Sequence, residues 1–346
     1  MFKEIFDGLM RDRFAKIALW VLFIIYFALA FANFIAPYSK DFSNRSLAYA
    51  PPSKIFTIDE NGKFSRPYTY NYKRSFDETN FNIYQLDRTQ KYYLKFFARG
   101  EDGKFHLVTV DKGGQLFLLG TDINGRDVFS RILFGGRISM TIGFLALFVL
   151  FPIGMIYGGI SGYFGGKVDA VMMRIAEGIM SIPSFYLLII LASILPAGMT
   201  SIQRFMLIVI ILAFIGWAGF ARVVRGMVLS IKNQEFVQAA KSIGASDFRI
   251  ITKHILPQTT SFIIVAITLS IPSYILSESG LSFLGLGIQQ PDASWGNMLK
   301  EAQVFSNIIY RPWLLTPGFL IFIAVLSFNL VGDTIRDILD PKSKIR

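Results

Sequence analysis

The sequence predicts an all-α polytopic membrane protein with six transmembrane helices. Its 346 residues are 53% hydrophobic and only 17% charged, and the mean hydropathy of +0.47 is far above that of an ordinary soluble domain. Six segments are apolar over about 20 residues, the helical length that crosses a hydrocarbon core. The distribution of Lys and Arg between the short loops agrees with one consistent topology.

The six apolar segments are separated by polar or glycine-containing stretches. They lie near residues 17–36, 140–160, 175–195, 205–221, 259–281 and 314–332. In lipid, only helices and closed barrels satisfy every backbone polar group, and segments of this length predict helices.

Basic residues in the short loops predict that both termini are cytoplasmic. The inner segments then contain Lys3, Arg11, Arg13, Lys16, Lys167, Arg174, Arg222, Arg225, Lys232, Lys241, Arg249, Lys253, Arg336, Lys342, Lys344 and Arg346. The two short outer loops contain only Arg204, Lys300 and Arg311. Long translocated segments do not count in this comparison.

Residues 1–36 are expected to form an amphipathic helix on the inner membrane surface, followed by the first span. The apolar residues at helical spacing are Phe2, Ile5, Phe6, Leu9 and Phe14. Ala30-Phe31-Ala32 resembles a signal-peptide cleavage site. The preceding segment is long and contains acidic residues, so we expect a retained span.

Residues 37–137 are expected to form an extracytoplasmic segment, an insertion of β or irregular structure between the first two helices. Turn signals at Glu60-Asn61-Gly62 and at 100–103 separate short runs at 92–97 and 105–110, which predict hairpins. Its many tyrosines suit contact with a protein or substrate, and the alternative is a lid that only covers the spans. Near its end, Gly120 and Gly125 are expected to supply turns beside Asp and Arg residues that pair.

Residues 138–346 contain the other five spans and a polar loop, 226–258, between the fourth and fifth. In this loop Phe236, Ala240 and Ile243 share one helical face. We expect Gly244 to end a first helix in the left-handed conformation and Ser246 to cap a second. Pro257 is placed to begin the fifth span. On pattern alone, this is also what an ordinary amphipathic cytoplasmic hairpin looks like.

The loop resembles the signature of ATP-binding-cassette importer permeases: Glu-Ala-Ala, three residues, Gly, nine residues, then Ile-x-Leu-Pro. Gln238-Ala239-Ala240, Gly244 and Leu256-Pro257 have the matching spacing. Gln238 replaces the usual Glu and His254 the usual Ile, and the first change puts a charge-dependent contact from that position in doubt. Segments 119–137 and 277–299 resemble the dipeptide and oligopeptide branch, which also includes nickel and glutathione importers.

This resemblance implies a C-type permease subunit with the type I importer fold. It implies a homologous sister permease, two ATP-binding subunits that bind ATP and Mg, an extracytoplasmic substrate-binding protein and a bacterial inner membrane. The chain itself is then expected to have no catalytic, cofactor or metal site. The residues expected to dock on the ATPase are Glu235, Phe236, Gln238, Ala239, Ala240, Ile243, Gly244, Ala245, Asp247, Leu256 and Pro257.

Glu278 is a carboxylate near the outer end of the fifth span, where an unpartnered charge is costly. It precedes a glycine-rich turn, and it is expected either to line the substrate cavity or to brace that turn. Together with Glu278, the candidates for the translocation pathway or outer gate are Ser282, Phe283 and Gly285.

Other function classes are disfavoured by composition. The net charge of +11 is spread over all loops, without the basic stripe that nucleic-acid binding requires. The absence of Cys and the presence of only two His exclude thiolate chemistry and disfavour a Cys/His metal cage. A nickel or other small-solute importer of the same family is the alternative. An ion-driven transporter or channel, relaying ions through Glu177, Glu278 or Asp333, does not explain the loop at 226–258.

Overall fold

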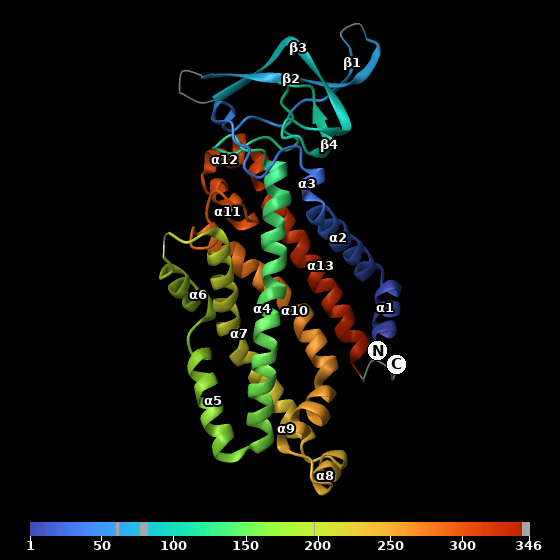
Figure 1. Cartoon of the computed structure of the whole chain (residues 1–346), viewed down its shortest axis with the longest axis vertical. Helices are drawn as coiled ribbons and strands as arrows, with labels where there is room; N and C mark the ends of the chain where they lie inside the picture. Colours follow the sequence, from blue (N-terminus) through green and yellow to red (C-terminus); the bar gives the residue numbers. More distant parts are fainter. Residues whose placement is uncertain (60–61, 77–81, 197, 341–346) are drawn as a thin grey trace. The chain divides into compact units, whose positions relative to one another are not determined.

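The computed structural model describes residues 1–59, 62–76, 82–196 and 198–340, so the C-terminal Lys342, Lys344 and Arg346 used in the topology argument lie outside them (Figure 1). The chain divides into two compact units, which are described separately. The helix unit comprises Met1–Leu22, Met140–Leu281 and Ile323–Arg346, and the sheet unit comprises Phe23–Ser139 and Ser282–Phe322.

Five helical segments in the described part of the chain are long and apolar enough to cross a membrane. Three are the single helices α2 (Arg13–Ala30), α4 (Val128–Phe164) and α7 (Ser201–Ile231). The other two are composite, Asp247–Phe283 ending in α10 (Thr260–Phe283) and Pro312–Leu339 containing α13 (Thr316–Leu339). The predicted helical membrane fold is therefore confirmed.

The expected span at 175–195 is not one straight helix. It is divided between α5 (Gly166–Met180) and α6 (Ser184–Ser193), which are bent by 74° and together make a sixth candidate span. Pro183 stands at the break. Its ring removes a backbone donor and disfavours helical geometry at the preceding residue, which explains why the helix stops there.

Glycines of α4 allow close packing in the helix unit. Gly154, Gly158 and Gly162 recur every four residues against α7. A Cβ atom built at Gly158 would lie 2.4 Å from the carbonyl oxygen of Ala221, and one at Gly162 would lie 2.7 Å from that of Arg225. Small residues at this spacing are typical of tightly packed membrane helices. The N-terminal helix expected from the apolar spacing is α1 (Phe2–Arg11).

The sheet unit contains an antiparallel sheet with the strand order β1-β2-β3-β4. The strands are β1 (Phe56–Ile58), β2 (Phe64–Phe76), β3 (Asn82–Arg99) and β4 (Phe105–Val110). The hairpin predicted around 100–103 is confirmed, because Gly103 N–H donates to the Gly100 carbonyl at 3.1 Å. Of the predicted turn at Glu60-Asn61-Gly62, the first two residues lie outside the described part, and Gly62 has a φ of 73°.

The segment before α4 forms the turns that the sequence predicted. Gly120 and Gly125 have φ values of 71° and 68°. The predicted ion pair is also present, because Arg126 Nε lies 2.6 Å from Asp122 Oδ2. The short helices of the sheet unit are α3 (Ala32–Ile35), α11 (Trp295–Leu299) and α12 (Phe305–Tyr310), with 3₁₀ turns at Arg45–Leu47, Lys300–Gln303 and Pro312–Leu315. Trp295, almost fully buried, donates from Nε1 to the Ile132 carbonyl at 3.0 Å.

Candidate functional site

The first limb of the polar loop is α8 (Glu235–Ser242). Its end has the hydrogen bonds of a Schellman motif: Ala245 N–H donates to the Ala240 carbonyl at 3.1 Å and Gly244 N–H donates to the Lys241 carbonyl at 3.0 Å. Gly244 has a φ of 79°. The expected left-handed glycine at the end of this helix is therefore confirmed.

The second limb is continuous with a membrane helix. It begins with α9 (Asp247–Arg249), passes through a π-helical segment at Ile250–Ile255 and a 3₁₀ turn at Leu256–Thr259, and becomes α10. Pro257 stands in the first turn of the 3₁₀ segment, where its missing N–H is tolerated. Ser246 occupies the N-cap position, but its side chain makes no cap hydrogen bond, so the expected side-chain cap is wrong. The Ser246 backbone carbonyl instead accepts from Ile250 N–H at 2.9 Å.

One face of this hairpin is packed inside the chain. The cluster of buried residues comprises Tyr163, Val224, Val228, Val237, Ala240, Ile250, Ile251, Ile255 and Leu256. Ala240 and Leu256 are only 4% and 6% exposed. The expectation that these two side chains offer a surface to a partner is therefore corrected: they attach the hairpin to α4 and α7. The spacing of the signature alone did not distinguish the two faces of α8.

Polar contacts fix the same attachment. The Tyr163 hydroxyl donates to Asp247 Oδ1 at 2.5 Å, and the Lys241 ammonium lies 4.9 Å from the centroid of the Tyr163 ring. Lys232 Nζ donates to the Gly162 carbonyl at 3.1 Å. Figure 1 shows α8 and α9 at the end of the helix unit where α4 passes into α5. The C-terminal end of α4 thus holds both limbs of the hairpin.

The opposite face of the hairpin is exposed. Of the expected docking residues, the exposed ones are Glu235, Phe236, Gln238, Ala239, Ile243, Gly244, Asp247 and Pro257, and Ala245 is half-buried. Asp247 is exposed although one of its carboxylate oxygens accepts from Tyr163 at the attachment. Ile243 is 84% exposed. Phe248, which the sequence argument did not select, is 68% exposed in the first turn of the second limb. An aromatic residue directly after a helix start in a polar loop is the feature that would have identified it. This outer face combines apolar side chains with flanking charges, a composition typical of protein interfaces.

A hollow of about 440 Å³ lies in the helix unit. It is lined by the bend between α5 and α6, by α7, and by a stripe of hydroxyl groups on α10. Those hydroxyl residues are Ser270, Ser273, Tyr274 and Ser277. Gly216 of α7 makes room for the Tyr274 side chain, because a Cβ atom there would lie 2.2 Å from its hydroxyl oxygen. This lining was not predicted from the sequence, although serines at i, i+3 and i+7 mark one helical face.

The four residues predicted for a pathway or outer gate do not line this hollow. Glu278 is fully buried in the helix unit. In the sheet unit, the Ser282 hydroxyl accepts from Ile288 N–H at 3.0 Å, and Gly285 has a φ of 81°. The Phe283 carbonyl accepts from Gln303 Nε2 at 3.2 Å. Ser282, Phe283 and Gly285 therefore stabilise the glycine-rich turn in this structure, and a gating role for the four residues stays a prediction.

Two models of known protein families match most of the chain. Residues 131–345 match the model of the binding-protein-dependent transport system inner membrane component. Residues 1–52 match the N-terminal TM domain of oligopeptide transport permease C. The matched range includes the hairpin and the hollow. The four strands fall between the two matches.

Curated relatives include two permeases of Bacillus subtilis. The dipeptide transport system permease protein DppC is 46% identical over 225 residues, which cover 64% of this chain and 68% of the relative. The oligopeptide transport system permease protein OppC is 41% identical over 252 residues, 72% of this chain and 80% of the relative. The glutathione transport system permease protein GsiD of Escherichia coli O157:H7 is 42% identical over 226 residues, 65% of this chain and 72% of the relative.

Proposed function

Since the chain belongs to the family of inner membrane components of binding-protein-dependent transport systems, we propose that it is the permease subunit of an ATP-driven peptide importer. The observation that supports this most is the continuity of the hairpin with α10, the helix whose hydroxyl stripe lines the hollow. The names of its dipeptide, oligopeptide and glutathione relatives support peptides as the cargo.

The outer face of the hairpin is the proposed docking surface for an ATPase subunit. Phe236, Ile243 and Phe248 supply its apolar contacts, with Glu235, Gln238, Ala239, Gly244, Ala245, Asp247 and Pro257 around them. Ala240 and Leu256 act from the inner face by holding this surface in place. ATP and Mg bind in the partner subunits, and this chain contributes no catalytic group.

Movement of the ATPase subunits would reach the membrane through the second limb. Because Asp247–Phe283 is one helical segment, displacement of the docked hairpin displaces α10 and with it the hydroxyl stripe. The Ser270 and Ser277 hydroxyls donate to the Ala266 and Ser273 carbonyls of their own helix. Their oxygens can still accept hydrogen bonds, which suits the amide N–H groups of a passing peptide. The π-helical segment at Ile250–Ile255 lies between the docking surface and the hollow, and segments of this kind occur frequently at functional sites.

The complete importer then contains a homologous sister permease, two ATP-binding subunits and an extracytoplasmic substrate-binding protein. The chain lies in the bacterial inner membrane with both termini cytoplasmic, which puts the hairpin in the cytoplasm and the β-sheet outside. The basic residues of the short inner loops support this orientation.

The docking surface is tested by exchanging one exposed aromatic residue for a charge. Phe248→Asp should abolish co-purification of ATPase activity with a tagged chain, because a charge on an interface anchor cannot be desolvated. Val304→Asp is the matched control, since Val304 is 54% exposed and belongs to the sheet unit, whereas the hairpin belongs to the helix unit. ATP hydrolysis by the complex purified in mild detergent is the readout. Retained ATPase activity with Phe248→Asp would contradict the proposed surface.

A further inference from the structure

The β-sheet lies outside the parts of the chain that match the two family models, so the family match indicates no role for it. Strands β1 to β4 occupy residues 56–110, between the two matched ranges that end at residue 52 and begin at residue 131. Three phenylalanines at its β3–β4 end remain open to the surroundings: Phe96 is 58% exposed, Phe97 is 64% exposed and Phe105 is 54% exposed. Large apolar side chains held in water are costly unless another surface covers them.

The outer end of α2 marks the membrane boundary within the sheet unit. The 18 residues of α2 span about 27 Å at the helical rise, close to the thickness of a hydrocarbon core. Arg137 donates from Nε to the Leu29 carbonyl at 2.6 Å and from Nη2 to the Ala30 carbonyl at 3.0 Å. A guanidinium group held at the C-terminal carbonyls of a membrane helix is typical of the headgroup level.

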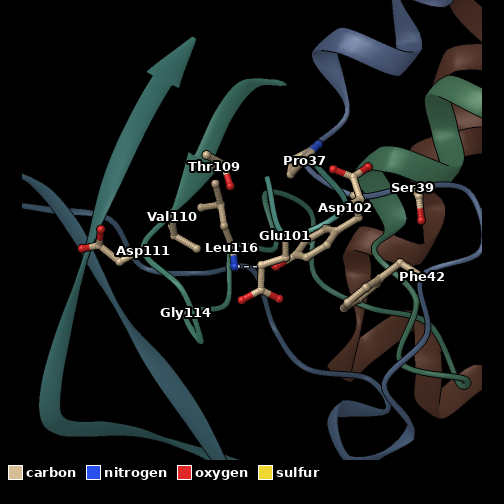
Figure 2. A pocket seen from close by; sticks show the side chains of 11 residues that line it. Pro37, Ser39, Phe42, Glu101, Asp102, Thr109, Val110, Asp111, Gly114 and Leu116 are labelled. Atoms are coloured by element: carbon tan, nitrogen blue, oxygen red, sulfur yellow. Dashed lines mark hydrogen bonds between the residues drawn. The ribbon is translucent and has the colours of Figure 1, made fainter. Parts of the chain in front are cut away.

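The β3–β4 end of the sheet is fixed a few residues beyond this boundary. The buried His106 ring, at the start of β4, places Nδ1 2.6 Å from the Ala36 carbonyl and Nε2 2.9 Å from Asp102 Oδ1. Figure 2 shows Asp102, in the turn between the two strands, beside Pro37. The Phe97 ring centroid lies 6.0 Å from that of Phe34, which follows α2 by four residues. Phe97 is thereby held at the level where the first span leaves the membrane.

A series of aromatic side chains runs from the outer half of α2 to the β3–β4 end of the sheet. Along α2 the ring centroids of Phe23 and Phe27 are 6.1 Å apart, and those of Phe27 and Phe31 are 4.7 Å apart. All three side chains are exposed in the chain, as expected for residues that face lipid. Phe34 and Phe97 continue the series into the sheet. Phe97 has a φ of 50°, a sparsely populated conformation for a bulky residue.

A hollow of about 220 Å³ lies beside this series, between the end of α2, the β3–β4 turn and α4. Three cationic side chains line it: Lys40, Lys104 and Arg137. Asp41 and Asp102 line it as well, so the hollow offers both signs of charge. Lys40 also lies 3.6 Å from Asp292. A phospholipid headgroup, with a phosphate and often an ammonium group, matches this lining.

The smaller hollow of about 100 Å³ shown in Figure 2 has different chemistry. Its carboxylates already bind the chain: Glu101 accepts from Gly113 N–H at 2.9 Å, and Asp111 accepts from Tyr93 N–H at 3.0 Å. These contacts hold the sheet together. Within the described part of the chain, the lining of this hollow thus offers no cationic side chain to a lipid phosphate, in contrast to the hollow beside the aromatic series.

We propose that the β3–β4 end of the sheet rests on the outer leaflet of the membrane, with Phe97 and Phe105 in the interfacial layer and a phospholipid headgroup in the hollow lined by Lys40, Lys104 and Arg137. Aromatic rings are favoured at this depth, and cations there attract lipid phosphates. The assignment of the leaflet rests on the proposed orientation of the chain, whereas the contact with lipid does not depend on transport.

The absence of cysteine makes the natural sequence suitable for a depth measurement. Phe97→Cys and Phe64→Cys are each given a nitroxide label in nanodiscs of phosphatidylethanolamine and phosphatidylglycerol. Phe64 is the matched control, because it is 89% exposed at the start of β2. The label at residue 97 should collide with oxygen and be protected from a water-soluble nickel chelate, whereas the label at residue 64 should be accessible to the chelate. Equal chelate access at both positions would overturn the proposal.

A binding protein is the other candidate for the same surface. If the label at residue 97 is accessible to the chelate in nanodiscs and becomes protected only when substrate-binding protein is added, the lipid proposal is wrong. The hollow has its own test in Lys104→Glu, which should lower the amount of phospholipid retained in native mass spectrometry. The exposed Lys112→Glu should leave it unchanged. Equal amounts of retained phospholipid in the two variants would contradict the proposed headgroup site. None of these readouts requires an ATPase partner, so failure here is distinguishable from failure of the importer assignment.

Discussion

Gly244 gives the hairpin its turn through backbone conformation alone. Its φ of 79° is one that side chains rarely adopt, and a Cβ atom built there would meet nothing within 4 Å. A substitution is therefore strained without being crowded. The cost in folding free energy is expected to come from the left-handed conformation, at about 1–2 kcal/mol.

Gly244→Val should accordingly uncouple ATP hydrolysis from uptake while the chain remains in the membrane. Gly226→Ala in α7 is the matched control, because this glycine also has open space around its Cβ position but has no positive φ. The measurement compares peptide uptake with ATP hydrolysis in proteoliposomes. Normal uptake by the valine variant would show that the turn geometry is not needed for coupling.

Asp127, just before α4, is a buried carboxylate that makes the stability of the folded chain depend on pH. Burial raises the pKa of its side chain to about 7. Ser130 donates to Asp127 Oδ2 from its backbone N–H at 2.7 Å and from its hydroxyl at 2.6 Å, which partly offsets that rise. The unfolded pKa is about 3.9, so the folded chain retains a proton that the unfolded chain releases. The free energy of unfolding therefore falls as the pH rises from about 4 towards 7, and the loss is complete above that range.

Asp127→Asn keeps an acceptor for the Ser130 N–H and removes the titration. Its stability advantage over the natural sequence should grow between about pH 5 and pH 8, by on the order of 2–3 kcal/mol. Thermal unfolding in nanodiscs at both pH values measures it. A constant difference between Asp127→Asn and the natural sequence would refute the buried titration.

Helix α8 has one face packed against the chain and one exposed face, which is the proposed docking surface. Val237 and Ala240 pack into the cluster under the hairpin, whereas Ala239 faces outward. The family signature contains both alanines, and sequence spacing assigned both to docking. Burial of one of them separates attachment of the hairpin to the chain from contact with a partner.

Paired substitutions separate these tasks. Ala240→Glu buries a charge and should destabilise the hairpin by several kcal/mol, which hydrogen exchange of 235–255 detects as faster exchange. Ala239→Glu should leave exchange unchanged and weaken co-purification of the ATPase. If both variants exchange at the natural rate, the packing assigned to Ala240 is wrong.

At the scale of the whole molecule, the proposed orientation is tested by labelling. Because the chain has no cysteine, a single cysteine can be introduced at a chosen position and labelled there. We expect Lys112→Cys, in the sheet unit, to react with a membrane-impermeant maleimide on intact spheroplasts. Ser242→Cys, at the end of α8, should react only after permeabilisation. Reaction of residue 242 from outside would reverse the topology and with it the docking proposal.

The membrane fold, the family signature and the left-handed Gly244 could be predicted from the sequence, because apolar length, residue spacing and glycine preference are local properties of the chain. The sequence also predicted the hairpins of the sheet from alternating runs and turn residues. Three features follow from the packing of the chain and could not be predicted: Ala240 is buried while Ala239 is exposed, Ser270, Ser273 and Ser277 line a hollow, and the Phe97 ring lies near that of Phe34. Burial depends on the atoms of segments far away in the sequence, and a helical pattern indicates a face without indicating what covers it.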